Sequence, residues 1–221
     1  MKLRFTQSLT EIGDVHSYFF EPLQQVQWQA GQYLNITLSD VAPVYAERLF
    51  TIASAPHEGH IRITTLITES PFKQRLIQLQ PGDVVDADQL GGDFTWIDDN
   101  RKKLFLAGGI GVTPFRSIIS DQLHKRISIN ADLLFGGRKN QQPFMSELQQ
   151  SVKQDPTFSL SVITDRRITI QDIASAAPDY ADRLIYLAGP QSFVEGFGEL
   201  FMEGGIPRSQ IKYDWFDGYF E

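Results

Sequence analysis

The hydrophobic period of the sequence changes near residue 100, and this change limits the folds that the chain can adopt. Before it, short alternating or aromatic-rich runs are separated by turn residues, which is typical of a small antiparallel β-barrel. After it, buried runs of four to seven apolar residues alternate with amphipathic helical segments. That order predicts a doubly wound parallel sheet with helices on both faces. We therefore expect two domains, residues 1–98 and 99–221, which meet in a polar stretch.

The expected elements follow from this division. In the first domain we expect strands over residues 2–9, 15–20, 33–38, 48–53, 61–67 and 84–87. One helix interrupts them, because Ser70 is a good N-cap, Pro71 fits the first helical position, and Phe72, Leu76 and Leu79 have helical spacing. In the second domain we expect strands over residues 103–107, 131–135, 158–162 and 184–188, and helices over 114–124, 146–151, 170–174 and 191–202.

Composition removes several classes of function. Residues 1–100 hold 6 Lys and Arg against 13 Asp and Glu, and residues 101–221 hold 14 against 14, so neither half has the net basic charge that nucleic-acid binding requires. The chain has no cysteine, so disulfides, thiolate zinc sites and cysteine-ligated iron–sulfur clusters are excluded, and redox chemistry needs a bound cofactor. No apolar run approaches the roughly 20 residues of a membrane span, and no signal peptide is evident. We expect a cytoplasmic protein without a membrane partner.

Three strand ends of the second domain carry glycine. The first is followed by Gly108, Gly109 and Gly111 and then by Thr113 and a helix. Nucleotides bind at the carboxyl ends of parallel strands, where glycines let a pyrophosphate approach the backbone and a helix N-terminus favours the anion. The alternative is a tight turn that needs glycine only for its backbone angles. One loop alone does not separate these two interpretations.

The other two strand ends add to the nucleotide interpretation. Arg138 and Lys139 follow a glycine pair at the end of the neighbouring strand, where two cations can hold the 2′-phosphate of an adenosine ribose. The alternative is a solvated basic loop. Gly189 and Pro190 stand at a third strand end, again before a helix. Together the three ends favour a dinucleotide site.

A strand of the first domain carries Arg48, Phe50 and Thr51, with Arg48 and Phe50 on one face and Thr51 on the other. This Arg-x-Phe-Thr pattern, followed by Gly-Gly-x-Gly-x-Thr-Pro at residues 108–114, resembles the ferredoxin–NADP reductase family of flavin-dependent oxidoreductases. Residues 28–33, 70–73 and 90–94 resemble further motifs of the family, in the expected order. The resemblance covers nearly the whole chain.

The resemblance implies that Arg48 binds the flavin phosphate, Phe50 packs against the isoalloxazine and Thr51 offers its hydroxyl to flavin N5. Each role suits the side chain, since arginine binds phosphate bidentately, an aromatic ring stacks, and a hydroxyl both donates and accepts. Thr51 and Phe50 are the expected catalytic residues. The resemblance also implies FAD contacts from Tyr33, Ser70, Phe72, Lys73 and two aromatics near the end of the chain, Tyr219 and Phe220. One of these two aromatics would cover the flavin as a lid.

In the second domain the resemblance implies that NADPH or NADH is bound by Gly108, Gly109, Gly111, Thr113, Arg138, Lys139, Gly189 and Pro190. The cation pair favours NADPH. The sequence departs from many relatives at Ala188, where they have a cysteine near the reactive nicotinamide carbon. We expect this to alter rate or affinity and to leave activity intact. The four histidines show no metal-ligand spacing, and no metal site is expected.

The expected activity is hydride transfer from NAD(P)H to FAD, with electrons passed to a separate acceptor: ferredoxin, flavodoxin, an oxygenase component or a small molecule. Two alternatives stay open. The chain is similar in length and in Gly136-Gly137-Arg138 to flavin reductases, which use flavin as a substrate. A non-catalytic relay or regulatory subunit that binds flavin and nucleotide is the alternative from another class.

Overall fold

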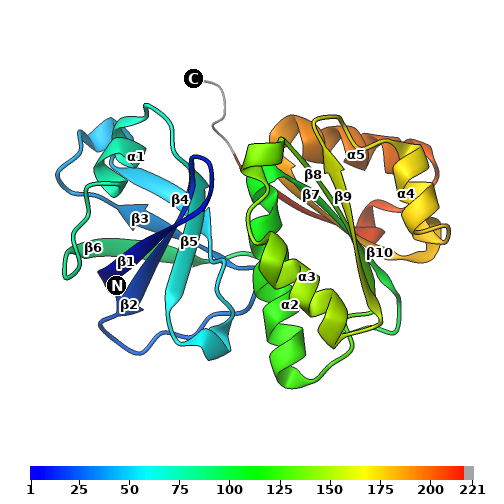
Figure 1. Ribbon diagram of the computed structural model, residues 1–221, viewed down its shortest axis with the longest axis horizontal. Coiled ribbons are helices and arrows are strands. Elements are labelled where there is room, and N and C mark those ends of the chain that lie inside the picture. The colour runs from blue at the N-terminus through cyan, green and yellow to red at the C-terminus, as the bar shows by residue number, and fades with distance from the viewer. Residues whose placement is uncertain (217–221) are drawn as a thin grey trace.

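Two sheets of opposite strand arrangement make up the protein, for which a computed structural model describes residues 1–216 (Figure 1). The first sheet is antiparallel and the second is parallel, as the change in hydrophobic period predicts. The predicted two-part fold is therefore confirmed. The predicted boundary at residue 98 falls between the last strand of the first sheet and the first strand of the second.

The first sheet has six strands in the order β4-β3-β6-β1-β2-β5 and curves into a half-barrel. Alternation directs Leu3 and Phe5 of β1 inward, where they join a buried apolar cluster with Phe20 and Leu34. The strands are β1 (Lys2–Ile12), β2 (Val15–Pro22), β3 (Tyr33–Thr37), β4 (Glu47–Thr51), β5 (Ile61–Leu66) and β6 (Val84–Gly91).

Helix α1 (Pro71–Leu76) closes one end of this half-barrel and is shorter than its apolar spacing predicts. Pro71 begins it as expected, and Ser70 occupies the N-cap position, but the Ser70 side chain makes no capping hydrogen bond. The helix ends at Leu76, and Leu79 is buried from the turn that follows. Leu79 is therefore apolar because it is buried in the barrel core, and not because it continues the helix.

The second sheet is parallel throughout, in the order β11-β10-β7-β8-β9. Strands β8 and β9 follow β7 on one side of it, and the chain then crosses to the other side of β7 to form β10 and β11. The strand order therefore reverses between β7 and β10, which is the topological switch point. The strands are β7 (Lys103–Gly108), β8 (Ala131–Gly137), β9 (Phe158–Thr164), β10 (Leu184–Pro190) and β11 (Ile211–Phe216). The helices are α2 (Thr113–Lys125), α3 (Met145–Gln154), α4 (Ile170–Ala176) and α5 (Gln191–Glu203).

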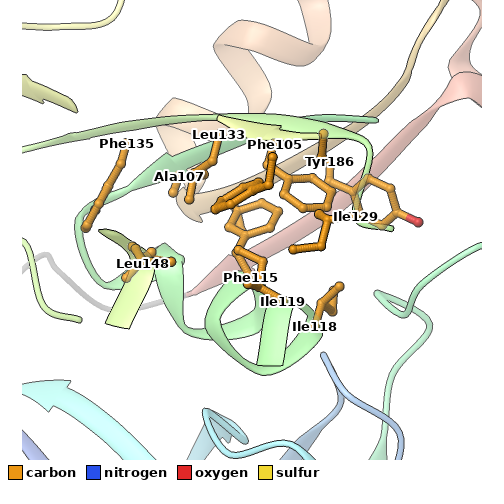
Figure 2. Close-up of a cluster of buried hydrophobic side chains, with 14 of the residues drawn as sticks. Phe105, Ala107, Phe115, Ile118, Ile119, Ile129, Leu133, Phe135, Leu148 and Tyr186 are labelled. Carbon is orange, nitrogen blue, oxygen red and sulfur yellow. The ribbon is translucent and has the colours of Figure 1, made fainter. Parts of the chain in front are cut away.

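Helices cover both faces of this sheet (Figure 1). On the face toward the barrel, Phe105 and Tyr186 of the sheet pack with Phe115 of α2, and Figure 2 shows these rings in contact. Ile173 of α4 and Phe201 of α5 fill the opposite face. The apolar runs of the sequence are thus buried on both sides, which is the usual reason for runs without alternation.

Helix α2 also joins the two domains. Its Ser117 Oγ donates to the Ser54 carbonyl at 2.7 Å, and Arg116 Nη1 donates to the Ala53 carbonyl at 3.0 Å. Ala53 and Phe94 belong to the same apolar cluster as the α2 side chains. The strand end after β4 is therefore fixed against the second domain. None of the helices within residues 1–216 has the length and apolar character of a bilayer span.

Candidate functional site

Two cations from separate elements of the barrel converge at the proposed flavin-phosphate site. Arg48 lies on β4, where its Nη1 donates to the Glu47 carbonyl at 2.7 Å, and Lys73 lies in α1. Burial lowers the pKa of the Lys73 ammonium, and the nearby positive charge of Arg48 lowers it further. Like charges held this close repel each other, and an anion bound between them would relieve the repulsion.

Ser70, the N-cap residue of the helix that carries Lys73, adds a hydroxyl donor. Its Oγ is buried and has no hydrogen-bond partner within the part of the chain that the structure describes. A buried hydroxyl without a partner is costly, and a bound molecule that accepts a hydrogen bond from it would remove that cost. A hydroxyl without a partner, at the start of the helix that carries Lys73, suits a phosphate group, and these residues therefore suit a flavin nucleotide.

Thr51 joins the barrel to the last strand of the sheet. Its Oγ1 donates to Oδ2 of Asp214 in β11 at 3.3 Å, across the domain boundary. Burial, and then the charge of Asp93, raise the pKa of Asp214 to about 7, while the hydrogen bond from Thr51 opposes the shift. Asp214 is thus a carboxyl group that can hold or release a proton near neutral pH.

The aromatic residues of the predicted flavin site lie mostly inside the barrel. Phe50 is 8% exposed and packs on Phe72, with 5.7 Å between ring centroids, and Phe72 is fully buried. The ring of Phe72 therefore supports Phe50 and has no free face for a flavin, and we leave it out of the proposed contacts. Tyr33 is partly buried and pairs with Thr51 across β3 and β4. Tyr219 and Phe220 lie outside the described residues.

The glycine loop of the second domain forms a short 3₁₀ turn, η3 (Gly109–Val112), directly before α2. Gly109 has a φ of +53°, which only glycine adopts easily, and a Cβ at Gly111 would lie 2.3 Å from the Ala188 carbonyl oxygen. Gly108 is paired with Gly136 of β8. The backbone therefore requires glycine at positions 109 and 111, as the tight-turn interpretation predicts. It also brings the loop against the end of β10, at the switch point where nucleotides bind.

The remaining coenzyme residues fall into two groups. Gly189 and Pro190 end β10 at this same edge, beside the loop. The hydroxyl of Thr113 is engaged, because its Oγ1 donates to the Ile110 carbonyl at 3.0 Å within the turn. Thr113 therefore shapes the loop and does not present its hydroxyl outward. Near the carboxyl ends of three neighbouring strands, Ala107 of β7, Ala188 of β10 and Asp214 of β11 are in register and form a row across the sheet.

Arg138 and Lys139 are exposed after β8, and the structure brings an acidic residue to them that their own loop lacks. Asp165 follows β9, and its Oδ1 accepts a hydrogen bond from the Lys139 amide at 3.1 Å. Parallel pairing of Gly137 with Thr164 places the two strand ends side by side. The sequence order separates these residues, so reasoning along the chain missed Asp165, just as it missed Asp214.

Within residues 1–216 no group of three or more acidic or histidine side chains is placed to hold a metal ion. The described site is instead a cation pair with an unpaired hydroxyl in the barrel and a glycine-rich strand edge in the sheet. A Thr–Asp hydrogen bond joins the two. Fold and site together define a class of two-domain proteins in which one half suits a flavin and the other suits a nicotinamide nucleotide.

Comparisons with known proteins agree with this class. Residues 105–198 match the oxidoreductase NAD-binding domain family. Reductase component 2 of a terephthalate 1,2-dioxygenase from a Comamonas species is 29% identical over 87% of this chain and 60% of that protein. A flavohemoprotein of Candida albicans is 24% identical over 98% of this chain and 59% of that protein. The chain thus spans about three fifths of the length of these curated relatives.

Solved structures share the whole two-domain fold. The FAD/NAD-binding domain of a nitric oxide dioxygenase from Vibrio cholerae has a TM-score of 0.82 at 19% identity, covering 97% of this chain and 98% of that one. A ferredoxin–NADP⁺ reductase from Plasmodium falciparum has a TM-score of 0.82 at 12% identity, covering 97% and 95%. The chain thus has the two-domain fold of these reductases, and its second domain matches the oxidoreductase NAD-binding domain family.

Proposed function

We propose that this chain takes a hydride from NADPH or NADH onto bound FAD and passes the electrons to a separate acceptor. The observation that carries the proposal is the hydrogen bond between Thr51 and Asp214. It joins the end of the barrel strand that carries Arg48 to the sheet edge formed by the glycine loop and Gly189. A flavin held by the barrel and a nicotinamide held by the sheet would meet at this junction.

FAD, when bound, supplies the hydride-accepting chemistry. In this proposal Arg48, Lys73 and Ser70 bind its phosphate, because two cations and a free hydroxyl match an anion. The Thr51 hydroxyl lies at the junction, and Asp214 beside it holds or moves a proton at its Oδ2. Phe50, backed by Phe72, contributes an apolar wall that excludes water.

For the coenzyme we favour NADPH. Arg138, Lys139 and Arg167 are exposed at the ends of β8 and β9, the side of the sheet to which an adenosine would extend from the switch point. Asp165 weakens this preference, because a carboxylate would repel a 2′-phosphate. Its Oδ1 accepts a hydrogen bond from the Lys139 amide, and this bond holds the carboxylate in place.

The acceptor is proposed to be a ferredoxin, a flavodoxin, an oxygenase component or a small molecule. Two relatives are named as reductase components of a dioxygenase, and structural neighbours include a cytochrome P450 reductase and a ferredoxin reductase of carbazole 1,9a-dioxygenase. These 221 residues contain no cysteine to ligate an iron–sulfur cluster, so an iron–sulfur acceptor would be a separate component.

The absorption spectrum of the purified protein, followed by anaerobic titration with each coenzyme, tests the proposal. We expect flavin absorbance that bleaches on addition of NADPH, and less readily with NADH. Colourless protein with saturable activity on added riboflavin would identify a flavin reductase. Bound flavin that neither coenzyme bleaches would identify a non-catalytic relay subunit.

A further inference from the structure

Arg62 of β5 is a barrel residue that reaches into the second domain. It is 4% exposed, and its Nη1 donates to Glu147 Oε1 of α3 at 3.1 Å. Its other nitrogens bind within the barrel, where Nε donates to Ser17 Oγ at 3.0 Å and Nη2 pairs with Glu11. A buried guanidinium with carboxylates on both sides of a domain boundary holds the two sides in one arrangement.

The same guanidinium supports the end of the loop between β8 and α3. Its Cζ lies 4.7 Å from the centre of the Phe144 ring, within the range of a cation–π contact. Phe144 is the last residue before α3, is 4% exposed and has a φ of +64°. A bulky residue keeps this backbone conformation only where its surroundings hold it. Arg62 therefore helps to fix one end of the loop formed by residues 138–144.

The hairpin between β1 and β2 supports the middle of that loop. At its tip Gly13 has a φ of +52°, and a Cβ there would lie 2.8 Å from the Asn140 carbonyl oxygen. Asn140 belongs to the short turn η4 (Lys139–Gln141), directly after Arg138. Glu11 and Ser17, the partners of Arg62, belong to the same hairpin. One hairpin and one arginine of the barrel thus contact the loop at two points.

The opposite side of the loop is bound to the sheet. Gln142 Nε2 donates to the carbonyls of Phe135 and Ile163 at 3.2 and 3.3 Å, and the Lys139 amide donates to Asp165. The loop is therefore held between the sheet on one side and the barrel on the other. These contacts fix the backbone that carries Arg138 and Lys139. The side chains of the two cations take no part in them.

We propose that Arg62 and Gly13 are positioning residues for the adenosine end of the coenzyme, which they affect through the loop carrying Arg138 and Lys139. This inference rests on the proposed function, because it requires that the loop bind a nicotinamide coenzyme. The barrel then contributes to coenzyme affinity as well as to flavin binding. Coupling between two sites of one protein typically changes affinity about five- to 150-fold.

A double variant, Arg62→Met with Glu11→Gln, tests the role of the arginine. The second change avoids leaving the Glu11 carboxylate buried without a cation, and Glu147 keeps a partner because Arg116 Nε donates to it at 2.8 Å. The probes are 2′,5′-ADP and 5′-AMP, titrated calorimetrically, since these fragments occupy the adenosine region alone. We expect a roughly tenfold higher dissociation constant for the fragment that wild type binds, with unchanged flavin content. Arg62→Lys should recover part of the affinity.

The pair Gly13→Ala and Gly82→Ala gives a test that alters no charge. Both glycines have positive φ, so both substitutions strain a turn, but a Cβ at Gly82 meets no atom within 4 Å among the described residues. We expect Gly13→Ala to weaken fragment binding several-fold by displacing Asn140, and Gly82→Ala to leave it unchanged.

Two failures are distinguishable. If wild-type protein binds neither NADPH nor NADH, the proposed function itself fails. If wild type binds a fragment and both folded test variants bind it as tightly, the inference is wrong while the function stands. A lower kcat with unchanged fragment affinity would likewise overturn it, because that result would assign Arg62 and Gly13 to domain alignment alone.

Discussion

The barrel and the sheet build their halves of the candidate site by different means. In the barrel, side chains form the site: Arg48 and Lys73 bring two neighbouring positive charges, and Ser70 brings a hydroxyl without a partner among the described residues, at the start of the helix that carries Lys73. In the sheet, the backbone forms the site: Gly109 is needed for its positive φ angle, and Gly111 is needed for the close approach of the loop to β10. The difference predicts that substitutions of these barrel side chains change affinity and leave the fold intact, whereas substitutions of these sheet glycines lower stability.

Gly111→Ala should have the largest effect. Its Cβ would lie within 2.5 Å of three backbone atoms of Ala188 and Gly189, which cannot rotate away. Overpacking usually costs about 1–3 kcal/mol, and we expect a loss of about 3 kcal/mol or more in the free energy of unfolding. Gly109→Ala is the control, because its Cβ meets open space and only its φ is strained, at about 1–2 kcal/mol. Urea titration measures both, and equal losses would contradict the backbone argument.

Arg48→Ala should release FAD from a folded protein. A hydrogen bond to a charged group contributes about 1.5–3 kcal/mol, which corresponds to a roughly ten- to hundredfold weaker affinity. Arg75→Ala is the control, since Arg75 is another arginine of the barrel, on the same helix as Lys73, but pairs with Asp40. Flavin content and the far-ultraviolet circular dichroism spectrum are the measurements. Full flavin occupancy in the folded Arg48 variant would remove Arg48 from the site.

Asp214 should make stability depend on pH. The unfolded chain releases this proton near a pKa of 3.8 and the folded chain near about 7, so stability should fall as pH rises between these values and level off above them. One pKa unit corresponds to about 1.4 kcal/mol, so we expect Asp214→Asn to be more stable than wild type at pH 8 by on the order of 4 kcal/mol, and similar at pH 4. Urea unfolding at both pH values tests this.

Thr51 offers the control for that measurement. Its hydrogen bond lowers the pKa of Asp214, so Thr51→Ala should extend the pH-dependent loss to higher pH, while Thr51→Ser keeps the hydroxyl and should match wild type. If Asp214→Asn shows the same pH profile as wild type, the carboxyl group does not titrate near neutral pH.

Arg138→Ala should have the smallest effect. The side chain is exposed and Lys139 remains beside it, so we expect the Michaelis constant for NADPH to rise only about three- to fivefold, with little change for NADH. Lys153→Ala, an exposed cation in the last turn of α3, is the control. Equal changes for the two coenzymes would show that the cation pair is a solvated loop.

Sequence patterns predicted what depends on neighbours along the chain. Alternation in β1 and the buried run of β7 identify the two sheets, because side-chain period follows backbone geometry. The glycine loop before α2 and the position of Ser70 before Pro71 were also visible, since turns and helix starts are local. The capping hydrogen bond expected of Ser70 does not form, because its hydroxyl is buried without a partner among the described residues.

The sequence by itself therefore determined two domains, their strand types and the two motifs that mark the site. The tertiary structure alone decided which distant residues meet there. Thr51 and Asp214 are 163 positions apart, and Lys139 and Asp165 are 26 apart, yet each pair is hydrogen-bonded. Such pairs arise from the order of strands in a sheet and from the packing of one domain on another, and neither leaves a periodic signal in the chain.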